Sequence, residues 1–259
     1  MRIPILTSIA VLIAALSACG SDGHSAATPA LPNLSRGAVR LSAMRPEIPD
    51  AAGEKIYISN SGANDIVTYT VSGKATKPTI SKGINDPGVI AVDSKGNIYV
   101  PNYEADTVTK YTSSGKPTKP TITVGLNEPT GVAVDANGKI YVSNAFTSNV
   151  TTYKPNGQQT TPTISNIDGP RGIAIDKSGK IYVTNYYGNS LTTFTASGKP
   201  TTPTITSGLS TPFGVTLDAA GKIYVINHSP QSLVTFTAKG ASTTPTITTL
   251  SEPWGVAIH

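Results

Sequence analysis

The chain has 259 residues, of which 14% are charged, and it contains 24 Gly and 20 Pro. This composition excludes a mainly helical protein and indicates an all-β one, in which strand-forming residues alternate with turn residues. Because Cys19 is the single cysteine, internal disulfides and cysteine metal clusters are also excluded.

The first 19 residues are predicted to be a lipoprotein signal peptide. An early Arg precedes an apolar run from about Ile3 to Leu16, which is short for a membrane span. The sequence Leu-Ser-Ala-Cys that ends at Cys19 resembles the lipobox of bacterial lipoproteins, and this resemblance implies a lipidated Cys19. The alternative is ordinary secretion with an incidental Cys19. The prediction is a lipoprotein anchored in a membrane of the bacterial cell envelope, facing the periplasm or the exterior.

Residues 20–53 are rich in Ser, Ala and Pro and show no sustained hydrophobic period. They are predicted to form a flexible tether between the lipid anchor and a folded domain. The alternative is that part of this segment, residues 37–44, packs on the edge of the domain.

From residue 54 to residue 259, one motif recurs five times. Its tyrosines are separated by steps of 42, 42, 41 and 42 residues and are Tyr57, Tyr99, Tyr141, Tyr182 and Tyr224. A period in the low forties with four strand-like segments per repeat predicts a β-propeller. The chain begins with a second strand and ends with a first strand, residues 255–259, so five blades are expected. The C-terminal strand would pair with the N-terminal blade, close the ring and remove two exposed sheet edges.

Two polar positions recur within the repeat. Asp-x-x-Gly lies between the first and second strands, at Asp93, Asp135, Asp176 and Asp218, and is typical of a hairpin turn with a structural Asp. An Asn ends the second strand in all five repeats, at Asn60, Asn102, Asn144, Asn185 and Asn227. These amides are expected to cap strand ends or hold loops. The alternative is a ring of five amides that binds a ligand or a cation such as Mg²⁺ or Ca²⁺.

The repeated pattern Pro-x-Gly-Val-Ala-Val-Asp, x-x-Gly, Lys-Ile-Tyr-Val-x-Asn resembles the NHL-repeat propellers and the related streptogramin-lyase-like repeats. The resemblance covers about residues 54–259. It implies a propeller fold, but it does not fix an activity, because these families include binding domains, scaffolds and enzymes.

A propeller has two faces. The loops between the second and third strands and the loops between successive blades lie on one face, which we call the loop face. The turns between the first and second strands and between the third and fourth strands lie on the other, which we call the basic face. Ten of the sixteen aromatic residues occupy two repeated core positions, and the other six fall in loops of the loop face. Together with polar neighbours, these residues are predicted to bind a ligand: Tyr103, Glu104, Phe146, Arg171, Tyr186, Tyr187, Phe213, His228 and Trp254. The alternative is that the aromatic residues only close one end of the ring.

The basic face takes its name from its lysines. Those in its turns are Lys74, Lys77, Lys95, Lys116, Lys119, Lys177, Lys199 and Lys239, and those at the starts of second strands are Lys55, Lys139, Lys180 and Lys222. Because the tether enters at this face, the lysines could turn it toward anionic lipid headgroups. The alternative is a solvated face that keeps the protein soluble. No basic groove with interleaved aromatic residues is present, so nucleic acid is not an expected partner.

The sequence argues against an enzyme without excluding one. It contains three His, of which His24 lies in the tether and His259 ends the chain, and it has no Gly-x-Ser-x-Gly motif. The acidic and Asn side chains by which related lactonase propellers hold a cation are not matched in the first strands. The lyase resemblance implies a catalytic His and Glu with Mg²⁺, for which His228 and Glu252 are candidates.

We therefore predict a binding or scaffolding module without a cofactor. It is expected to be a monomer that recognises a protein, peptide or glycan on the loop face. The alternative is a Mg²⁺-dependent streptogramin-lyase-like or lactonase-like enzyme.

Overall fold

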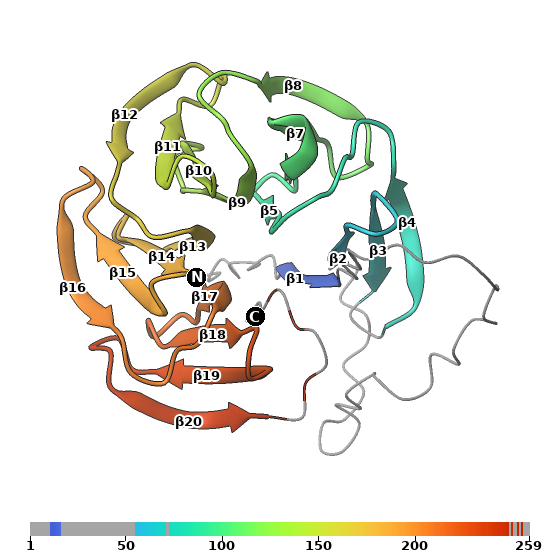
Figure 1. Cartoon of the computed structure of the whole chain (residues 1–259). Helices are drawn as coiled ribbons and strands as arrows, with labels where there is room; N and C mark the ends of the chain where they lie inside the picture. The colour runs from blue at the N-terminus through green and yellow to red at the C-terminus, as the bar shows by residue number, and fades with distance from the viewer. Residues whose placement is uncertain are drawn as a thin grey trace, which may run out of the picture.

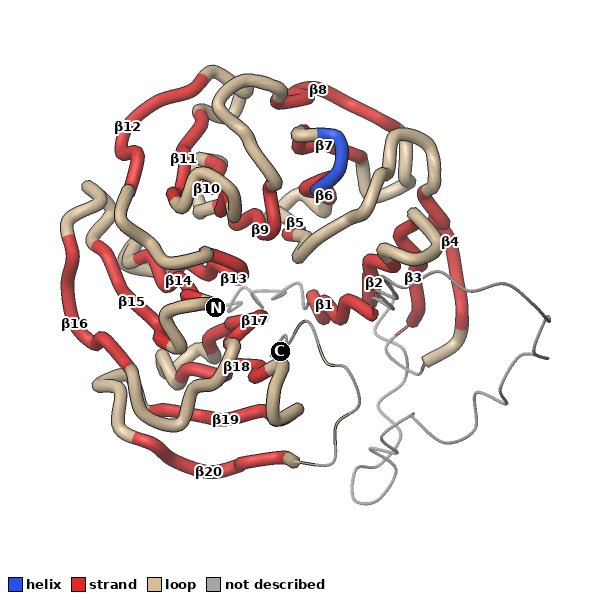
Figure 2. Tube along the Cα trace, in the orientation of Figure 1, coloured by secondary structure: helices blue, strands red, loops and turns tan. Residues whose placement is uncertain are grey.

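A computed structural model of the chain describes residues 55–70, 73–248, 250, 253 and 255, together with the backbone of residues 11–16. Five four-stranded sheets are arranged around a common axis as the blades of a propeller (Figure 1). The predicted all-β fold with five blades is confirmed. The one helical segment in the described residues is the short helix η1 (Tyr103–Ala105), drawn in blue in Figure 2. No helix in this part of the chain is long and apolar enough to cross a membrane.

The blades follow one another in chain order. The first contains β1 (Val11–Leu16), β2 (Lys55–Asn60), β3 (Asp65–Thr70) and β4 (Ala75–Ile80), and the second contains β5 (Ala91–Val92), β6 (Ile98–Asn102), β7 (Thr107–Tyr111) and β8 (Pro117–Ile122). The third contains β9 (Pro129–Val134), β10 (Ile140–Asn144), β11 (Asn149–Tyr153) and β12 (Gln159–Ile164). The fourth contains β13 (Pro170–Ile175), β14 (Ile181–Asn185), β15 (Ser190–Phe194) and β16 (Pro200–Ile205). The fifth contains β17 (Pro212–Leu217), β18 (Ile223–Asn227), β19 (Ser232–Phe236) and β20 (Ser242–Ile247).

The first blade differs from the expected arrangement at its inner position. There β1 lies beside β2 in parallel register, whereas the innermost strands of the other four blades pair antiparallel with their neighbours. Pairing with the strand β1 satisfies the backbone edge of β2 that would otherwise be unpaired. The structure thus places residues 11–16 where the sequence analysis expected the C-terminal strand. Residues 256–259 of that strand lie outside the described residues, so ring closure by this strand stays a prediction.

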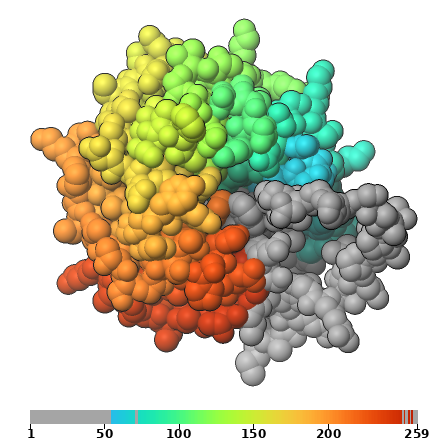
Figure 3. Space-filling view, viewed as in Figure 1, coloured from blue at the N-terminus to red at the C-terminus, as the bar shows by residue number. Residues whose placement is uncertain are grey.

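The core lies between successive blades. Four hydrophobic clusters each combine residues of two neighbouring blades, and in the cluster between the second and third blades Tyr99 and Ile122 pack with Val132 and Tyr153. In the space-filling view, neighbouring blades from the second to the fifth are in contact on this face of the ring (Figure 3). Of the ten repeated core aromatic residues, eight are buried, while Tyr69 and Tyr224 are partly buried. This packing is the interface that a repeat protein requires.

Glycines allow the inner strands to approach each other closely. A Cβ on Gly131 would lie 2.5 Å from the carbonyl oxygen of Arg171, and one on Gly172 would lie 2.3 Å from that of Phe213. Any larger residue would push neighbouring inner strands apart. The Gly of the repeated Pro-x-Gly sequence therefore sets the spacing of the blades around the axis.

The Asp of each hairpin turn has the expected structural role. The Asp93 carboxylate accepts hydrogen bonds from the backbone amides of Lys95 and Asn97 and from the hydroxyl of Tyr99. Burial raises the pKa of Asp93, but these bonds and one from the Asn97 side chain outweigh burial and leave the pKa below its ordinary value. Asp176 has a lowered pKa for the same reasons. These carboxylates stabilise turns.

Candidate functional site

Five of the predicted ligand-binding residues come together where the inner strands reach the loop face. We call Tyr103, Arg171, Tyr186, Phe213 and His228 the mouth cluster. Arg171 and Phe213 are the second residues of β13 and β17, and the other three directly follow the Asn that ends β6, β14 and β18. The cluster therefore combines residues of the second, fourth and fifth blades. The propeller brings together residues that are far apart in the sequence.

Three rings of the mouth cluster pack against one another: Tyr186 meets Phe213 and His228 edge to face, and the Phe213 and His228 rings are tilted by 38°. The centroid of the Tyr186 ring lies 6.1 Å from that of Phe213 and 6.3 Å from that of His228, and the Phe213 and His228 rings are 6.4 Å apart. Tyr187 extends the group, with its ring 5.2 Å from Tyr186 and 64% of its side chain and backbone surface exposed. Such contacts favour a rigid arrangement of aromatic rings. The site therefore has a packed base and an accessible ring, Tyr187, at its edge.

Arg171 lies between the aromatic rings and a carboxylate. Its guanidinium carbon is 5.2 Å from the centroid of the Tyr186 ring and 5.6 Å from that of Phe213, which are cation–π distances. Its guanidinium and the Glu128 carboxylate both interact with the Tyr103 hydroxyl. Burial, together with Glu128, raises the pKa of Tyr103 to about 12, and Arg171 opposes this effect. Tyr103 is therefore a neutral hydrogen-bonding group at physiological pH.

Two buried polar atoms at this site have no hydrogen-bond partner among the described residues. They are Nε of Arg171 and Oδ1 of Asn185, and the neighbouring residue Pro170 pairs with Asn185 across β13 and β14. Buried polar side-chain atoms normally have partners, so each exception calls for an explanation. The first is a donor beside the aromatic rings of Tyr186 and Phe213. The second is an acceptor on a side chain whose amide nitrogen bonds to Ser190 and Thr192 of β15.

A short loop explains the unpartnered acceptor. The loop between β12 and β13, residues 165–169, is one residue shorter than the corresponding loops 123–128 and 206–211. In those junctions the Oδ1 atoms of Asn144 and Asn227 accept hydrogen bonds from the backbone amides of Asn127 and Ser210. The Oδ1 atom of Asn185 lacks such a bond. The step of 41 residues in the repeat thus coincides with the site.

Hydroxyl groups of second strands fix the backbone of the mouth cluster. Ser143 donates a hydrogen bond of 2.6 Å to the carbonyl of Arg171, and Thr184 donates one of 2.6 Å to that of Phe213. The backbone amides of Tyr186 and His228 donate to the carbonyls of the preceding inter-blade loops. Because the strands hold these residues from both sides, the cluster is preorganised.

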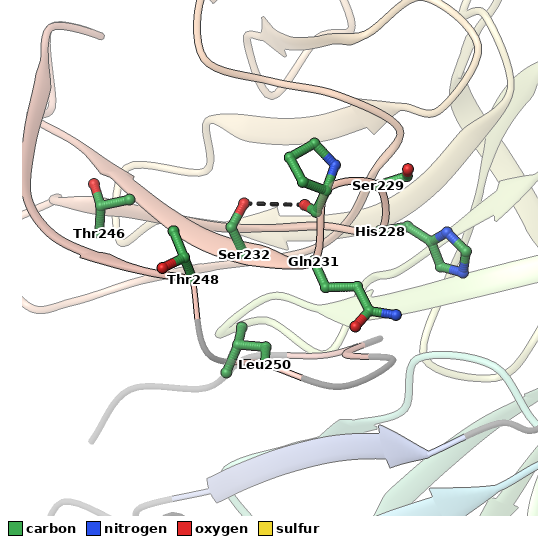
Figure 4. A pocket seen from close by; sticks show the side chains of 8 residues that line it. His228, Ser229, Gln231, Ser232, Thr246, Thr248 and Leu250 are labelled. Carbon is green, nitrogen blue, oxygen red and sulfur yellow. Dashed lines mark hydrogen bonds between the residues drawn. The ribbon is translucent and has the colours of Figure 1, made fainter.

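His228 also borders a cavity of ≈ 530 Å³ in the fifth blade. The lining is rich in hydroxyl and amide groups and consists of His228, Ser229, Pro230, Gln231, Ser232, Thr246, Thr248 and Leu250. Figure 4 shows the imidazole of His228 and the amide of Gln231 projecting from the same loop. Ser232 donates a hydrogen bond to the carbonyl of Pro230. The cavity would suit a polar group of a ligand that also contacts the aromatic rings.

The recurring Asn residues hold the loops that follow the second strands. Four of them are buried, namely Asn102, Asn144, Asn185 and Asn227, and the Asn60 amide donates to Asp65. Asn144, for example, donates to the side chains of Asn149 and Thr151. This arrangement favours the structural role over the alternative of a cation-binding ring.

The described residues do not fit a metal centre. They contain no group of three or more His, Cys, Asp or Glu side chains that could hold a metal ion. The amide oxygens of Asn102, Asn144 and Asn227, which a cation would need, accept backbone hydrogen bonds instead, and that of Asn185 lacks a partner among the described residues. We therefore derive no catalytic step that requires Mg²⁺ or Ca²⁺.

The remaining predicted residues are more scattered. Glu104 is exposed in η1 and Phe146 is 71% exposed, and the structure does not join either of them to the mouth cluster. Trp254, Glu252 and Cys19 lie outside the described residues. The sequence analysis missed Glu128 and the polar lining of the cavity. Glu128 directly precedes the repeated Pro, a position that is Asp86 in the second blade, so its acidic character was visible but its contact with Tyr103 was not.

The fold and the packed loop face define a β-propeller with a candidate ligand site at the end of its inner strands. Residues 42–259 match the Virginiamycin B lyase family, and the chain belongs to this family. Among curated proteins, none matches the sequence.

Solved structures show the same fold at low identity. Virginiamycin B lyase from Staphylococcus aureus is 18% identical with a TM-score of 0.63, and the match covers 80% of this chain and 71% of that chain. A catalytically inactive form of that enzyme with quinupristin is 17% identical, with a TM-score of 0.62 and the same coverage. A chain of the nidogen/laminin complex is 19% identical with a TM-score of 0.69, and the match covers 80% of this chain and 81% of that chain. An enzyme and a chain of a protein complex thus share the architecture.

Proposed function

We propose that this protein is an extracytoplasmic lipoprotein whose propeller binds an organic ligand at the mouth cluster. The observation that carries the proposal is the unpartnered Nε atom of Arg171, whose guanidinium lies over the rings of Tyr186 and Phe213. Leaving a buried polar atom unpaired costs about 1–3 kcal/mol. A cluster that only closed the end of the ring would be more stable with apolar side chains.

The chemistry of the cluster suits a peptide or a glycan. Both ligands offer hydrogen-bond donors and acceptors next to apolar surface, which the exposed ring of Tyr187 can stack against. A protein partner that inserts such a segment would use the same groups. In this proposal the module binds or scaffolds as a monomer and needs no cofactor.

A thermal-shift screen of the full chain tests this proposal. The ligands would be cell-wall peptides, oligosaccharides and divalent cations, and Tyr187→Ala would be compared with Val124→Ala. Both side chains are exposed on the loop face, at 64% and 68%, so neither change should affect folding much. We expect a peptide or glycan to stabilise the parent and Val124→Ala but not Tyr187→Ala. Equal stabilisation of all three proteins would contradict a site at the mouth cluster.

The anchor has a separate test. If Cys19 is lipidated, residues 1–18 are removed together with β1, and the position beside β2 is left to another strand, as the sequence analysis expected. Mass spectrometry of the membrane fraction should then find acyl groups on a mature N-terminus at Cys19, and Cys19→Ala should release the protein into the soluble fraction. A soluble mature protein without acyl mass would contradict the anchor and leave the ligand site unaffected.

A second candidate function is that of a lyase. It is favoured by the family match over residues 42–259 and by the place of His228 between the aromatic rings and the cavity. The test is chromatographic measurement of quinupristin turnover with and without Mg²⁺, by the parent and by His228→Ala. Turnover that requires both Mg²⁺ and His228 would establish the enzyme; no turnover would leave the binding module.

A further inference from the structure

The lysines of the basic face fall into two groups. Those at the starts of second strands have protein partners: the Nζ atoms of Lys55, Lys139 and Lys180 donate to backbone carbonyls at 3.0, 2.7 and 2.6 Å, and that of Lys222 donates to Thr244. Three of them also lie over tyrosine rings. The carboxylates of the hairpin turns are engaged in turn hydrogen bonds. These four lysines and four Asp residues balance in charge.

A second group of lysines on this face is exposed and unbalanced. Each of the five blades contributes one from the turn between its third and fourth strands, and these are Lys74, Lys116, Lys154, Lys199 and Lys239. Lys95 and Lys177 lie in hairpin turns of the same face, whereas Lys77 and Lys119, which the sequence analysis placed in its turns, lie within the outer strands β4 and β8. The seven lysines in turns add seven positive charges, distributed around the ring.

The loop face has the opposite charge. Among the described residues it carries the acidic side chains of Asp65, Asp86, Glu104, Asp106, Glu128 and Asp168 against the basic ones of Lys82 and Arg171. Six negative and two positive charges leave −4 on this face. The propeller is therefore polarised along its axis and would turn its basic face toward an extended anionic partner.

We propose that the basic face docks on an anionic lipid bilayer. Its charges are spread over a whole face, and the exposed large apolar residues among those described lie elsewhere, on the loop face and on β20, namely Val124, Phe146, Tyr187 and Ile247. Such a face fits a broad charged surface better than a ligand that inserts a side chain. β2 also begins on this face, at Lys55, so the segment that directly precedes β2 joins the blade here. Docking would point the mouth cluster away from the membrane.

Vesicle co-sedimentation of the full chain tests this inference independently of the ligand site. Vesicles of phosphatidylcholine alone would be compared with vesicles that also contain phosphatidylglycerol. The variant Lys74→Gln/Lys116→Gln/Lys199→Gln removes three charges from the basic face. Its control, Thr147→Glu/Thr206→Glu/Ser207→Glu, changes the net charge equally at exposed positions of the loop face.

We expect the parent and the control to prefer anionic vesicles and to lose this preference in high salt. The triple Gln variant should partition about 100-fold more weakly at low salt, since each lysine near the surface contributes up to about fivefold. Equal binding by both variants, or equal binding to both kinds of vesicle, would overturn the inference. So would tight binding to a soluble anionic polysaccharide without a preference among vesicles. A lipid anchor alone would be recognised by binding that neither salt nor lipid charge changes.

Discussion

Glycine at the turn between the third and fourth strands is expected to be essential for packing one blade on the next. Gly157 has a φ of 85°, and a Cβ there would lie 2.5 Å from Cβ of Pro120 in the second blade. Gly138, in the same blade, has a φ of 79°, but its Cβ would meet Pro155 at 3.4 Å, an ordinary contact. Comparing Gly157→Ala with Gly138→Ala therefore separates the contact between blades from backbone strain.

The magnitudes follow from these two terms. Positive φ costs an Ala about 1–2 kcal/mol at either position, and the forced contact with Pro120 adds about 1–3 kcal/mol at Gly157 only. Urea unfolding followed by circular dichroism would measure both variants, with the midpoint and the slope fitted separately. We expect a lower midpoint for Gly157→Ala than for Gly138→Ala at an unchanged slope. Equal midpoints would refute the claim that this glycine is required by the neighbouring blade.

Three further predictions concern the repeated polar groups. Asn144→Ala should cost about 1–3 kcal/mol in urea unfolding, because it leaves the Asn127 amide without its acceptor; a melting temperature that depends on Mg²⁺ in the parent and not in this variant would instead support a cation site. Lys139→Met should lower the free energy of unfolding by about 1 kcal/mol, because it removes the hydrogen bond to the backbone carbonyl of Thr161. Lys154→Met, at an exposed turn, should change the free energy of unfolding little. Equal effects of the two substitutions would argue against a structural role for Lys139. The lowered pKa values of Asp93 and Asp176 give stability that is present above their unfolded values and lost as pH falls through the folded ones, so stability should decline below about pH 4. Asp93→Asn should weaken that decline in acid titrations monitored by circular dichroism, and an unchanged decline would contradict this assignment.

Much of the fold follows from local sequence. The spacing of the tyrosines predicts the blades, and each Asp-x-x-Gly predicts a turn, because these features depend on residues close together in the chain. The contact of Gly157 with Pro120 joins neighbouring repeats. The bond from Lys139 to the carbonyl of Thr161 joins the inner and outer parts of one blade. No local pattern identifies such contacts, because they depend on how strands are placed in space.

The candidate site shows the same limit. The aromatic residues of the loop face stand out in the sequence, yet Phe213 is 6% exposed and Phe146 is 71% exposed. Phe213 lies in the inner strand β17, but Tyr186 and Phe146 both lie in loops after second strands, and only Tyr186 packs with Phe213 and His228. The type of segment therefore does not decide which aromatic residue joins the packed base. The step of 41 residues is the one sequence signal that marks the fourth blade, which contains Arg171 and Asn185. That the short loop leaves the Asn185 oxygen without a hydrogen bond could be seen only in the structure.

The most direct test of the central claim is the stability and ligand response of Arg171→Met. The Met keeps apolar contact with Tyr186 and Phe213. It loses cation–π contacts of about 0.5–1 kcal/mol each and the interaction of the guanidinium with the Tyr103 hydroxyl, about 0.5–1.5 kcal/mol, and it removes a buried unpartnered donor that costs about 1–3 kcal/mol. These terms nearly cancel, so if Arg171 serves a ligand, the free energy of unfolding should change by less than about 1 kcal/mol, while stabilisation by a peptide or glycan disappears. A loss of more than about 1 kcal/mol of stability with the ligand response intact would contradict the account and show that the mouth cluster only holds the ring together.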